Sequence, residues 1–546
     1  MRIALAQINT TVGDFSGNLE KQRAAITKAR QAGAQLVVLP ELATCGYPPM
    51  DLLERESFRT RQREALEALT AEAHGIAIVT GAIVSSEGDS EKISNAAVAL
   101  AERRVAFVQA KTLLPTYDVF DESRYFQPAR RRRPWEFAGR KLGLTVCEDI
   151  WSGDFWGPRR LYPLDPVREQ IEAGADLIVT VSASPWEQRK IALREAMMSD
   201  HARRHRVPGI FVNLVGGNDE LIFDGASFAV NAAGRITTRL ACFEEDLEVV
   251  DPDTATTLGV QRDEEDVELL ERALVLGVRD YLHKIGATRC VVALSGGIDS
   301  AVTAHIAERA LGAENVLGLL MPGPYSSVHS VTDAEALTRN LGLETRQIRI
   351  DGIYKAFLEQ LSQLFGPAES YGVTQENLQA RVRGTLLMAV SNHESRIVLA
   401  TGNKSELSVG YTTLYGDLVG GLAVLGDVLK RDVYRLARFA NRSGERIPPH
   451  TIEKPPSAEL APGQLDSDAL PPYGVLDEVL AQVIEQGRPA GRLEPPPGAT
   501  PEQIRWILQQ LDRNEYKRRQ APLVLRVSPK AFGTGRRLPI VHRSDI

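Results

Sequence analysis

The chain has 546 residues, too many for one hydrophobic core, so we expect two or three domains. Its 43% apolar and 25% charged residues are ordinary for a globular protein, and its net charge of −7 argues against bulk binding of nucleic acid, which needs a basic surface. No run approaches ~20 apolar residues, and the N-terminus MRIALAQI lacks the features of a signal peptide. We therefore expect a cytoplasmic protein without a transmembrane helix.

Short apolar runs alternate with amphipathic helical stretches in the first half of the chain. The apolar runs predict strands at residues 3–7, 36–39, 76–80, 142–146, 177–181 and 210–214. Between them, helical spacing of apolar residues predicts helices at 18–32 and 57–73. This alternation is typical of an α/β fold with largely buried strands.

The acidic segment 246–271 predicts a domain junction near residue 260, with one domain at 1–258 and another at 259–546. A second series of strands is predicted at 290–294, 316–321, 344–350 and 397–401, at intervals that suit crossovers in a parallel sheet. The tail after Ile447 is rich in proline and charge. Its predicted helix at 501–512 favours ordered segments that pack on the second domain.

The strongest motif of the second domain is an apolar strand followed by a tight turn and a helix. Its residues are Ser295, Gly296, Gly297, Ile298, Asp299 and Ser300. The glycines allow close approach of the backbone to a ligand, and the following helix directs free N–H groups at an anion. Asp299 is suited to hold Mg²⁺ on phosphate oxygens. A strand–Gly-Gly–helix turn alone is as often structural as functional, and the motifs GxxxxGK[ST] and GxGxxG are absent.

In the first domain, three chemically compatible residues each follow a predicted strand. Cys147 supplies a thiol, and Lys111 is a cation that favours the thiolate. Glu41 is placed to take a proton and return it to a leaving amine. A lone cysteine is more often an inert hydrophobe, and each charge alone is more often an ordinary strand-end residue.

Cys45, Cys242 and Cys290 form no CxxC pair, which favours reduced thiols over disulfides or zinc.

The SGGIDS hexad resembles the loop of the ATP pyrophosphatase superfamily, whose members cleave ATP between the α- and β-phosphates. By itself it leaves GMP, asparagine and argininosuccinate synthetases and tRNA-modifying enzymes open. Five further segments resemble the NAD synthetase family. LATGNKSELSVGYTTLYGD resembles its signature, and MPGPYSSVHSVTDA resembles its second phosphate-side loop. The segments ENLQARVRG, PSAELAPGQLDSDALPPYGVLD and NEYKRRQAP also match its pattern in order. Two positions depart from that pattern. Pro324 replaces an often polar or basic residue, and Leu429 replaces the usual proline.

This resemblance implies a ligand set for the second domain. ATP would be held by Ser295, Gly296, Gly297, Asp299, Ser300 and Thr401, deamido-NAD⁺ by Asn377, Glu406 and Lys517, and Mg²⁺ by Asp299 and Glu406. Taken singly, Asn377 also fits a helix cap, and Glu406 and Lys517 also fit solvated side chains.

Three segments resemble the signatures of the nitrilase, or carbon–nitrogen hydrolase, superfamily: LPELATCGYPPMDLL, KTLLPTYDVFDESRYF and LTVCEDIW. More narrowly, they resemble the glutaminase domain of NAD synthetases, and the segment SASPWEQRK supports this. The resemblance implies that Glu41 is the base, Lys111 the catalytic lysine, Cys147 the nucleophile and Glu122 a second carboxylate beside the lysine. It also implies glutamine-binding residues, namely Tyr117, Ser184 and Lys190. The segment 151–168 departs most from the pattern and has no assigned role. The implied fold is an α-β-β-α sandwich followed by a doubly wound parallel sheet.

Together the two resemblances imply a glutamine-dependent ligase that amidates deamido-NAD⁺ (nicotinic acid adenine dinucleotide). ATP and Mg²⁺ would activate the acid as an adenylate, and ammonia from glutamine would yield NAD⁺, AMP, diphosphate and glutamate. Because most free ammonia is protonated near pH 7, we hypothesise a sheltered passage for NH₃. The family also implies a homo-oligomer. Two alternatives stay open: an amidotransferase for another acid, and a silent nucleotide-binding scaffold.

Overall fold

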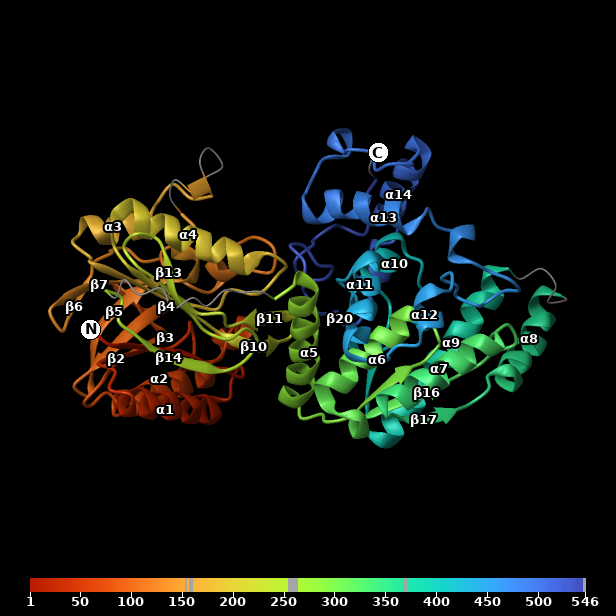
Figure 1. Ribbon diagram of the computed structural model, residues 1–546, viewed down its shortest axis with the longest axis horizontal. Helices are drawn as coiled ribbons and strands as arrows, with labels where there is room; N and C mark the ends of the chain where they lie inside the picture. The colour runs from red at the N-terminus through yellow and green to blue at the C-terminus, as the bar shows by residue number, and fades with distance from the viewer. Residues whose placement is uncertain (153–154, 157–160, 254–263, 367–371, 544–546) are drawn as a thin grey trace. The chain divides into compact units, whose positions relative to one another are not determined.

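The computed structural model describes residues 1–152, 155–156, 161–253, 264–366 and 372–543. The chain divides into two compact units, Met1–Asp263 and Glu264–Ile546 (Figure 1). The boundary predicted between residues 258 and 259 falls outside the described residues and stays a prediction. No helix within the described ranges is long and apolar enough to cross a membrane.

The first unit is built on two six-stranded sheets. In spatial order the first contains β14 (Asp246–Val250), β1 (Ile3–Gln7), β2 (Leu36–Val38), β3 (Ala77–Ser86), β4 (Asp89–Ala101) and β5 (Arg104–Ala110). The second contains β13 (Ile236–Arg239), β12 (Phe228–Val230), β9 (Gly209–Asn213), β8 (Leu177–Ser182), β7 (Arg140–Val146) and β6 (Trp135–Phe137). A separate hairpin joins β10 (Val215–Asn218) to β11 (Leu221–Asp224).

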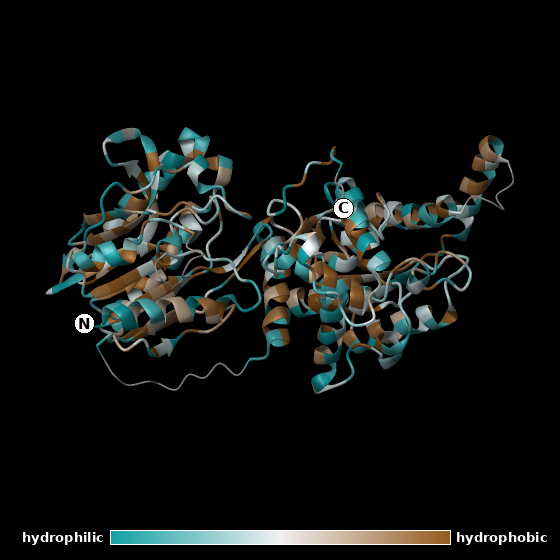
Figure 2. Cartoon of the chain, turned by 90° about the horizontal axis from the view of Figure 1, so that it is seen from above, coloured by the Kyte–Doolittle hydropathy of each residue, from teal (hydrophilic) through white to brown (hydrophobic). Residues whose placement is uncertain are grey.

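The alternation of strand side chains explains how the layers stack. In β1, Ile3 and Leu5 belong to the core between the sheets, whereas Ala4 and Ala6 belong to the core under the helices. Helices α1 (Phe15–Gln31) and α2 (Glu56–Thr70) contact the first sheet, and α3 (Pro166–Glu172) and α4 (Lys190–His205) contact the second. Figure 2 shows hydrophobic brown on the strands and hydrophilic teal on the outer parts of the helices. The α-β-β-α sandwich is therefore confirmed.

One strand lies where the sequence predicted a junction. Residues 246–250, at the start of the acidic segment, form β14 and pair antiparallel with β1, so that Ile3 opposes Val250. Its apolar residues Leu247 and Val249 pack on the core below α1. The strand has only three apolar residues, Leu247, Val249 and Val250, and the acidic residues around them masked this short pattern.

The second unit contains one six-stranded sheet, and all its strands are parallel. Their spatial order is β17 (Glu344–Gln347), β16 (Val316–Leu320), β15 (Cys290–Ala293), β18 (Ile397–Ala400), β19 (Leu422–Ala423) and β20 (Leu523–Val524). The chain runs outward from β15 to β17 and then returns to add β18 on the other side of β15. Ligands of open α/β sheets bind at such a reversal, beyond the carboxyl ends of the strands.

Helices accompany these strands along the chain. They are α5 (Asp266–Lys284), α6 (Ile298–Leu311), α7 (Val328–Leu341), α8 (Asp351–Phe365), α9 (Val373–Glu394), α10 (Lys404–Val409), α11 (Lys430–Ala440) and α12 (Pro449–Glu453). The C-terminal tail adds α13 (Tyr473–Leu480), α14 (Pro501–Arg513) and α15 (Glu515–Arg518). Leu476, Ile507 and Leu511 from the tail share one buried cluster with Leu407 of α10. The tail is thus part of this unit's core.

Candidate active sites

Cys147 lies at the carboxyl end of β7, where the strand turns into the short helix η3 (Cys147–Ile150). Its φ is +40°, in the left-handed region that residues other than glycine rarely adopt. The side chain is 6% exposed. Val146 of β7 pairs with Val181 of β8, so the residues that follow them, Cys147 and Ser182, lie beside each other.

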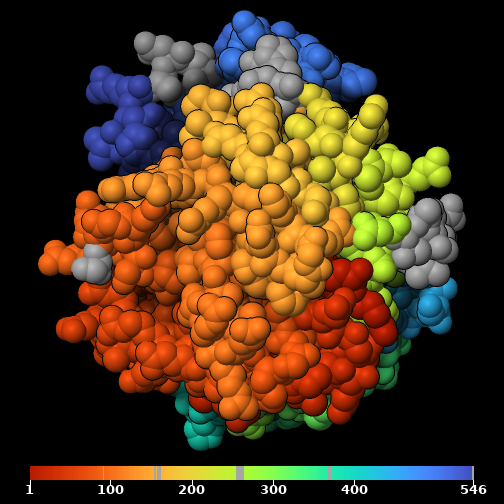
Figure 3. Space-filling view, turned by 90° about the vertical axis from the view of Figure 1, so that its left-hand side faces the viewer, coloured from red at the N-terminus to blue at the C-terminus, as the bar shows by residue number. Residues whose placement is uncertain are grey.

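Lys111 lies between two carboxylates in the same buried region. Its Nζ is 2.8 Å from Glu41 Oε1 and 2.7 Å from Glu122 Oε1. Asn95 donates a hydrogen bond of 2.6 Å to Glu41 Oε1, and the Ala183 N–H donates one of 2.8 Å to Glu41 Oε2. Together these hydrogen bonds fix the orientation of the Glu41 carboxylate. Lys111 and Glu41 are 1% and 0% exposed. Figure 3 shows the surface of the first unit in space-filling form, coloured from red at the N-terminus to yellow.

The charges of this cluster shift one another's protonation. Burial would lower the pKa of Lys111, but the carboxylates of Glu122 and Glu41 raise it well above its usual value. Burial raises the pKa of Glu122 to about 7, against the opposing effect of Lys111. Burial and Glu41 raise the pKa of the Cys147 thiol, whereas Lys111 lowers it. The pKa of the thiol is therefore above its usual value, and the Glu41 carboxylate and the Lys111 ammonium group both act on it.

Two of the residues predicted to bind glutamine, Tyr117 and Lys190, lie near a carboxylate that the sequence reasoning missed. Tyr117 donates a hydrogen bond of 2.9 Å to Oε1 of Glu148, which is 3% exposed, and Tyr162 donates one of 2.7 Å. Lys111 and Lys190 both lower the pKa of Glu148, while burial raises it overall. The available signal was an acidic residue directly after the predicted nucleophile.

The other two predicted glutamine ligands are also placed. The Lys190 Nζ lies 4.4 Å from the centroid of the Trp151 ring and 3.4 Å from Glu187. Ser184 is buried just after β8, and its N–H donates to Asn213 Oδ1 at 2.8 Å. Part of the unassigned segment 151–168 lies outside the described residues.

In the second unit, the predicted phosphate loop joins β15 to α6. Gly296 has a φ of +78°, and a Cβ added there would lie 2.2 Å from the Ser330 carbonyl oxygen of α7. Only glycine therefore fits this position. The loop is also held from inside: Ser295 Oγ accepts from the Gly297 N–H at 3.2 Å, and Ser300 Oγ donates to the Gly297 carbonyl at 2.9 Å.

A cavity of about 460 Å³ opens beside this loop. Its volume is in the usual range for a small-molecule site. Apart from Gly296, all residues that the sequence assigned to ATP and deamido-NAD⁺ line it: Ser295, Gly297, Asp299, Ser300, Thr401, Asn377, Glu406 and Lys517. The structure thus brings together residues that are more than 200 positions apart in the chain.

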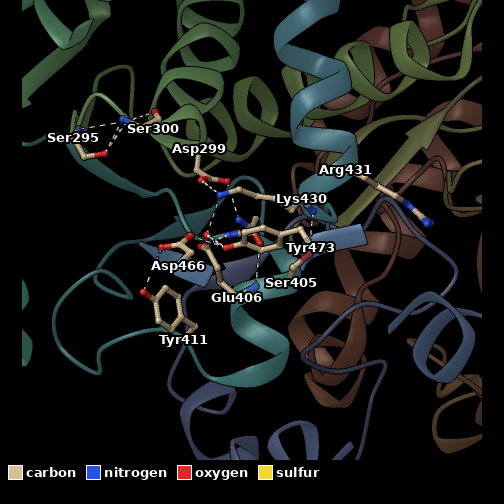
Figure 4. A network of polar contacts seen from close by, with 12 residues as sticks. Ser295, Asp299, Ser300, Ser405, Glu406, Tyr411, Lys430, Arg431, Asp466 and Tyr473 are labelled. Carbon is tan, nitrogen blue, oxygen red and sulfur yellow. Dashed lines mark hydrogen bonds and ion pairs between the residues drawn. The ribbon is translucent and has the colours of Figure 1, made fainter. Parts of the chain in front are cut away.

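Lys430 lies at the centre of a polar network at one end of the cavity (Figure 4). Its Nζ is 2.5 Å from Asp299 Oδ2 and 3.2 Å from Glu406 Oε1. Asn403 donates a hydrogen bond of 2.8 Å to Asp299 Oδ1 and also caps α10, with Glu406 completing a capping box. The two predicted metal ligands therefore converge on one cationic atom.

Two residues of the C-terminal tail complete this network (Figure 4). The Tyr473 hydroxyl donates to Asp466 Oδ2 at 2.9 Å and lies 3.5 Å from Glu406 Oε1. The Lys430 Nζ lies 5.1 Å from the centroid of the Tyr473 ring. Burial raises the pKa of Glu406 to about 7; Lys430 opposes the rise, and Asp299 adds to it.

The remaining two predicted ligands of the dinucleotide already have protein partners. Thr413 Oγ1 donates to Asn377 Oδ1 at 2.7 Å. The Lys517 Nζ donates to the carbonyl oxygens of Gly410 and Thr412, at 2.7 Å each. Both residues line the cavity, so Lys517 keeps a third N–H for a ligand there.

Comparison with known proteins identifies the family. Residues 2–259 match the family model of the carbon-nitrogen hydrolases, and residues 270–521 match that of NAD synthase. A glutamine-dependent NAD(+) synthetase from Synechocystis sp. is 46% identical over 551 residues, covering 99% of this chain and 98% of the relative. The chain belongs to the glutamine-dependent NAD(+) synthetase family.

Other members agree with this assignment. The glutamine-dependent NAD(+) synthetase of Thermotoga maritima is 40% identical over 588 residues, covering 100% of this chain and 99% of the relative. The Acinetobacter baumannii enzyme, solved in complex with ADP, matches with a TM-score of 0.78 at 37% identity over 99% of this chain and 98% of that one. The predicted family, the α/β fold and the enzyme class, a glutamine-hydrolysing ligase of NAD biosynthesis, are therefore confirmed.

The donor set of the synthetase unit fits a hard divalent cation. Carboxylate oxygens are the ligands that Mg²⁺ prefers, and Asp299 and Glu406 already direct oxygens at a single ammonium group. Within the described residues, no group of three His, Cys, Asp or Glu side chains is arranged to hold a metal ion. A cation at Asp299 and Glu406 would therefore need further ligands from water or a bound substrate.

Three residues of the synthetase site were missed by the sequence reasoning: Lys430, Asp466 and Tyr473. Lys430 follows Leu429, one of the two departures from the family pattern. Leu429 is 3% exposed and packs in the core cluster beside α13. This packing explains how leucine can replace the usual proline at that position. Asp466 and Tyr473 lie in the block PSAELAPGQLDSDALPPYGVLD. The sequence indicated this block as a family resemblance but did not indicate that these two residues join the polar network around Lys430.

Proposed function

We propose that this chain synthesises NAD⁺ from deamido-NAD⁺, with ammonia released from glutamine at Cys147 and the acid activated at the Ser295–Ser300 loop. The observation that carries the proposal is the pairing of two sites in one chain. Lys111 lies between Glu41 and Glu122 beside a buried thiol, and the phosphate loop borders a cavity of about 460 Å³.

The first site suits hydrolysis of an amide through a thioester. The Cys147 sulfur attacks the glutamine carboxamide carbon while Glu41 takes the thiol proton. Lys111 stabilises the oxyanion, and Glu41 returns the proton as the C–N bond breaks and ammonia leaves. Glu41 then activates water, which cleaves the thioester and releases glutamate. The buried Glu148, held by Tyr117 and Tyr162, offers a counter-charge for the ammonium group of glutamine.

The second site suits transfer of AMP to a carboxylate. A carboxylate oxygen of deamido-NAD⁺ attacks the α-phosphorus of ATP, and the bond to the β-phosphate oxygen breaks to release diphosphate. The loop N–H groups and Lys430 stabilise the phosphate charges, and Asn377 and Lys517 hold the dinucleotide. Mg²⁺ held by Asp299 and Glu406 would neutralise charge that develops on the phosphates. Ammonia then attacks the acyl carbon and displaces AMP.

Nucleotide binding by the A. baumannii relative, which was solved with ADP, supports a nucleotide in this cavity. The family resemblance also supports a homo-oligomer, which sedimentation of the full chain would test. An amidotransferase for another acid is the alternative, and AMP release against a panel of carboxylic acids distinguishes it.

The decisive test is Cys147→Ala. We expect NAD⁺ formation from glutamine to be lost, because the nucleophile is gone, and NAD⁺ formation from added ammonia to stay within about twofold of wild type. NAD⁺ is measured by an enzymatic cycling assay with each nitrogen source in parallel. Loss of both activities would contradict the division of labour between the two units.

A further inference from the structure

The two residues that must meet in the amidase site are carried by different sheets. Lys111 directly follows β5, the edge strand of the first sheet, and Cys147 directly follows β7 of the second. Backbone hydrogen bonds fix the register of strands within a sheet, whereas two facing sheets meet through their side chains. The distance between Lys111 and the thiol therefore depends on contacts that cross from one sheet to the other.

Asp149 makes such a contact with three backbone N–H groups. Its Oδ1 accepts hydrogen bonds from the N–H groups of Thr112 and Leu113, at 2.9 Å each, just after Lys111. Its Oδ2 accepts one of 3.0 Å from the N–H of Val146, just before Cys147. The side chain is 1% exposed, so no water competes for these donors.

We infer that Asp149 is a positioning residue of the amidase site, whose carboxylate fixes Lys111 against Cys147 by joining the two sheets that carry them. The inference rests on the proposed function of those two residues. Glu41 also crosses between the sheets, through the Ala183 N–H, but it is itself a reacting group. Asp149 has no such task, because both its oxygens are occupied by backbone donors.

The chemistry of the contact requires a carboxylate. Three donors meet two acceptor oxygens, so an uncharged asparagine would have to turn an N–H₂ group toward either Val146 or the Thr112–Leu113 pair. Either choice places a donor against a donor and leaves one side of the contact open. Burial raises the pKa of Asp149 to about 6, and the three N–H groups and Lys111 oppose this rise, so the group is ionised at pH 8.

The test is Asp149→Asn in the full chain, assayed at pH 8. We expect the kcat for glutamine hydrolysis to fall about 100-fold, because a shift of ~1 Å between reacting groups has that effect. The KM for glutamine should change less than about threefold, since the ligand-binding side chains are untouched. NAD⁺ formation from ammonia should equal that of wild type, which shows that the second unit is folded, and the retained KM for glutamine shows the same for the first unit.

A matched control lies in the same turn. The Ser152 hydroxyl donates to the Asp149 backbone carbonyl and to Asp165, and Ser152→Ala leaves all three bonds of the carboxylate in place. We expect Ser152→Ala to keep wild-type kcat with glutamine. If it lost activity as Asp149→Asn does, the turn and not the carboxylate would be responsible, and the inference would be overturned.

Two further measurements separate the outcomes. Asp149→Ala with added formate should regain kcat with glutamine, since formate supplies the missing carboxylate; a lack of rescue would overturn the inference in favour of a general folding role of Asp149 in the first unit. Cys147→Ala is run in parallel. If it retains glutamine-driven synthesis, the proposed function fails. If it loses that activity while Asp149→Asn keeps wild-type kcat, only the inference about Asp149 fails.

Discussion

Glu406 and Lys430 form a buried ion pair beside the phosphate loop, with Asp299 as the second carboxylate on the same ammonium group. A buried pair of this kind contributes little net stability, because desolvation offsets the attraction. In the proposed function, its value lies in holding charges where a phosphate and a cation would bind. Lys111, with Glu41 and Glu122, repeats the arrangement in the amidase unit, again as one ammonium group with two carboxylates.

The raised pKa of Glu406, at about 7, predicts how proton and cation compete in the synthetase unit. Below pH 7 the carboxyl binds a proton, so Mg²⁺ must displace that proton. We expect the Mg²⁺ concentration for half-maximal exchange of labelled diphosphate into ATP, with deamido-NAD⁺ present, to rise about tenfold from pH 8 to pH 6. This exchange needs no ammonia, so the titration of ammonia does not interfere.

The control for this prediction is Glu406→Gln, which has no proton to lose. Its Mg²⁺ requirement should already be high at pH 8 and should change less than about twofold down to pH 6. An equally steep pH dependence in wild type and variant would assign the titration to ATP or to another group, and would contradict the role of Glu406.

At the scale of elements, the turn between β15 and α6 is set by its contact with α7. The Gly296 backbone lies so close to the Ser330 carbonyl that a Cβ would approach it to 2.2 Å. This contact holds the loop at the carboxyl end of β15, and the helix N-terminus of α6 follows directly. The loop is therefore shaped by packing before any nucleotide binds.

Gly296→Ala is expected to displace the loop from α7, because neither the φ of +78° nor the space at Ser330 admits a methyl group. We expect the affinity for ADP, measured by calorimetry, to fall at least about tenfold, and the chain to lose about 1–3 kcal/mol of stability. The control is Gly352→Ala in α8, where an added Cβ meets nothing within 4 Å. Wild-type ADP affinity in Gly296→Ala would show that the loop tolerates the side chain.

The sequence predicted several strands with strong apolar runs to within one or two residues, although β3, predicted at 76–80, extends to Ser86. β1 was predicted at 3–7 and spans Ile3–Gln7, and β15 and β18 each end one residue before the prediction. β14 and β20 were missed because short edge strands carry little apolar pattern. Their pairing is decided by distant parts of the chain.

The residues of the candidate sites also fall into two groups, those that a local motif indicates and those that only tertiary packing brings together. Residues within a local motif, such as Asp299 in its hexad and Cys147 after its strand, were predicted from the sequence, and the structure places both in the candidate sites. Lys430 and Tyr473 were missed, since their function depends on where α11 and α13 place them around Asp299 and Glu406. No spacing in the chain encodes that meeting, because it results from tertiary packing of the tail.

For the whole molecule, the fusion of two chemistries in one chain raises the question of how nitrogen passes between them. Ammonia that equilibrates with water near pH 7 is mostly protonated and is not nucleophilic. A sheltered transfer would keep it as NH₃ until it meets the acyl-adenylate. We therefore predict that the two units act in sequence on the same nitrogen atom.

This prediction is tested by isotope competition. Wild-type protein receives glutamine with a ¹⁵N-labelled amide together with excess unlabelled ammonium, and the NAD⁺ formed is analysed by mass spectrometry. Sheltered transfer gives a ¹⁵N fraction in NAD⁺ far above the fraction in the bulk ammonium pool. Equal fractions would mean that ammonia is released to solvent before it reacts. Cys147→Ala, given the same mixture, should form only unlabelled NAD⁺, because its nitrogen then comes from the pool alone and the label enters through that thiol.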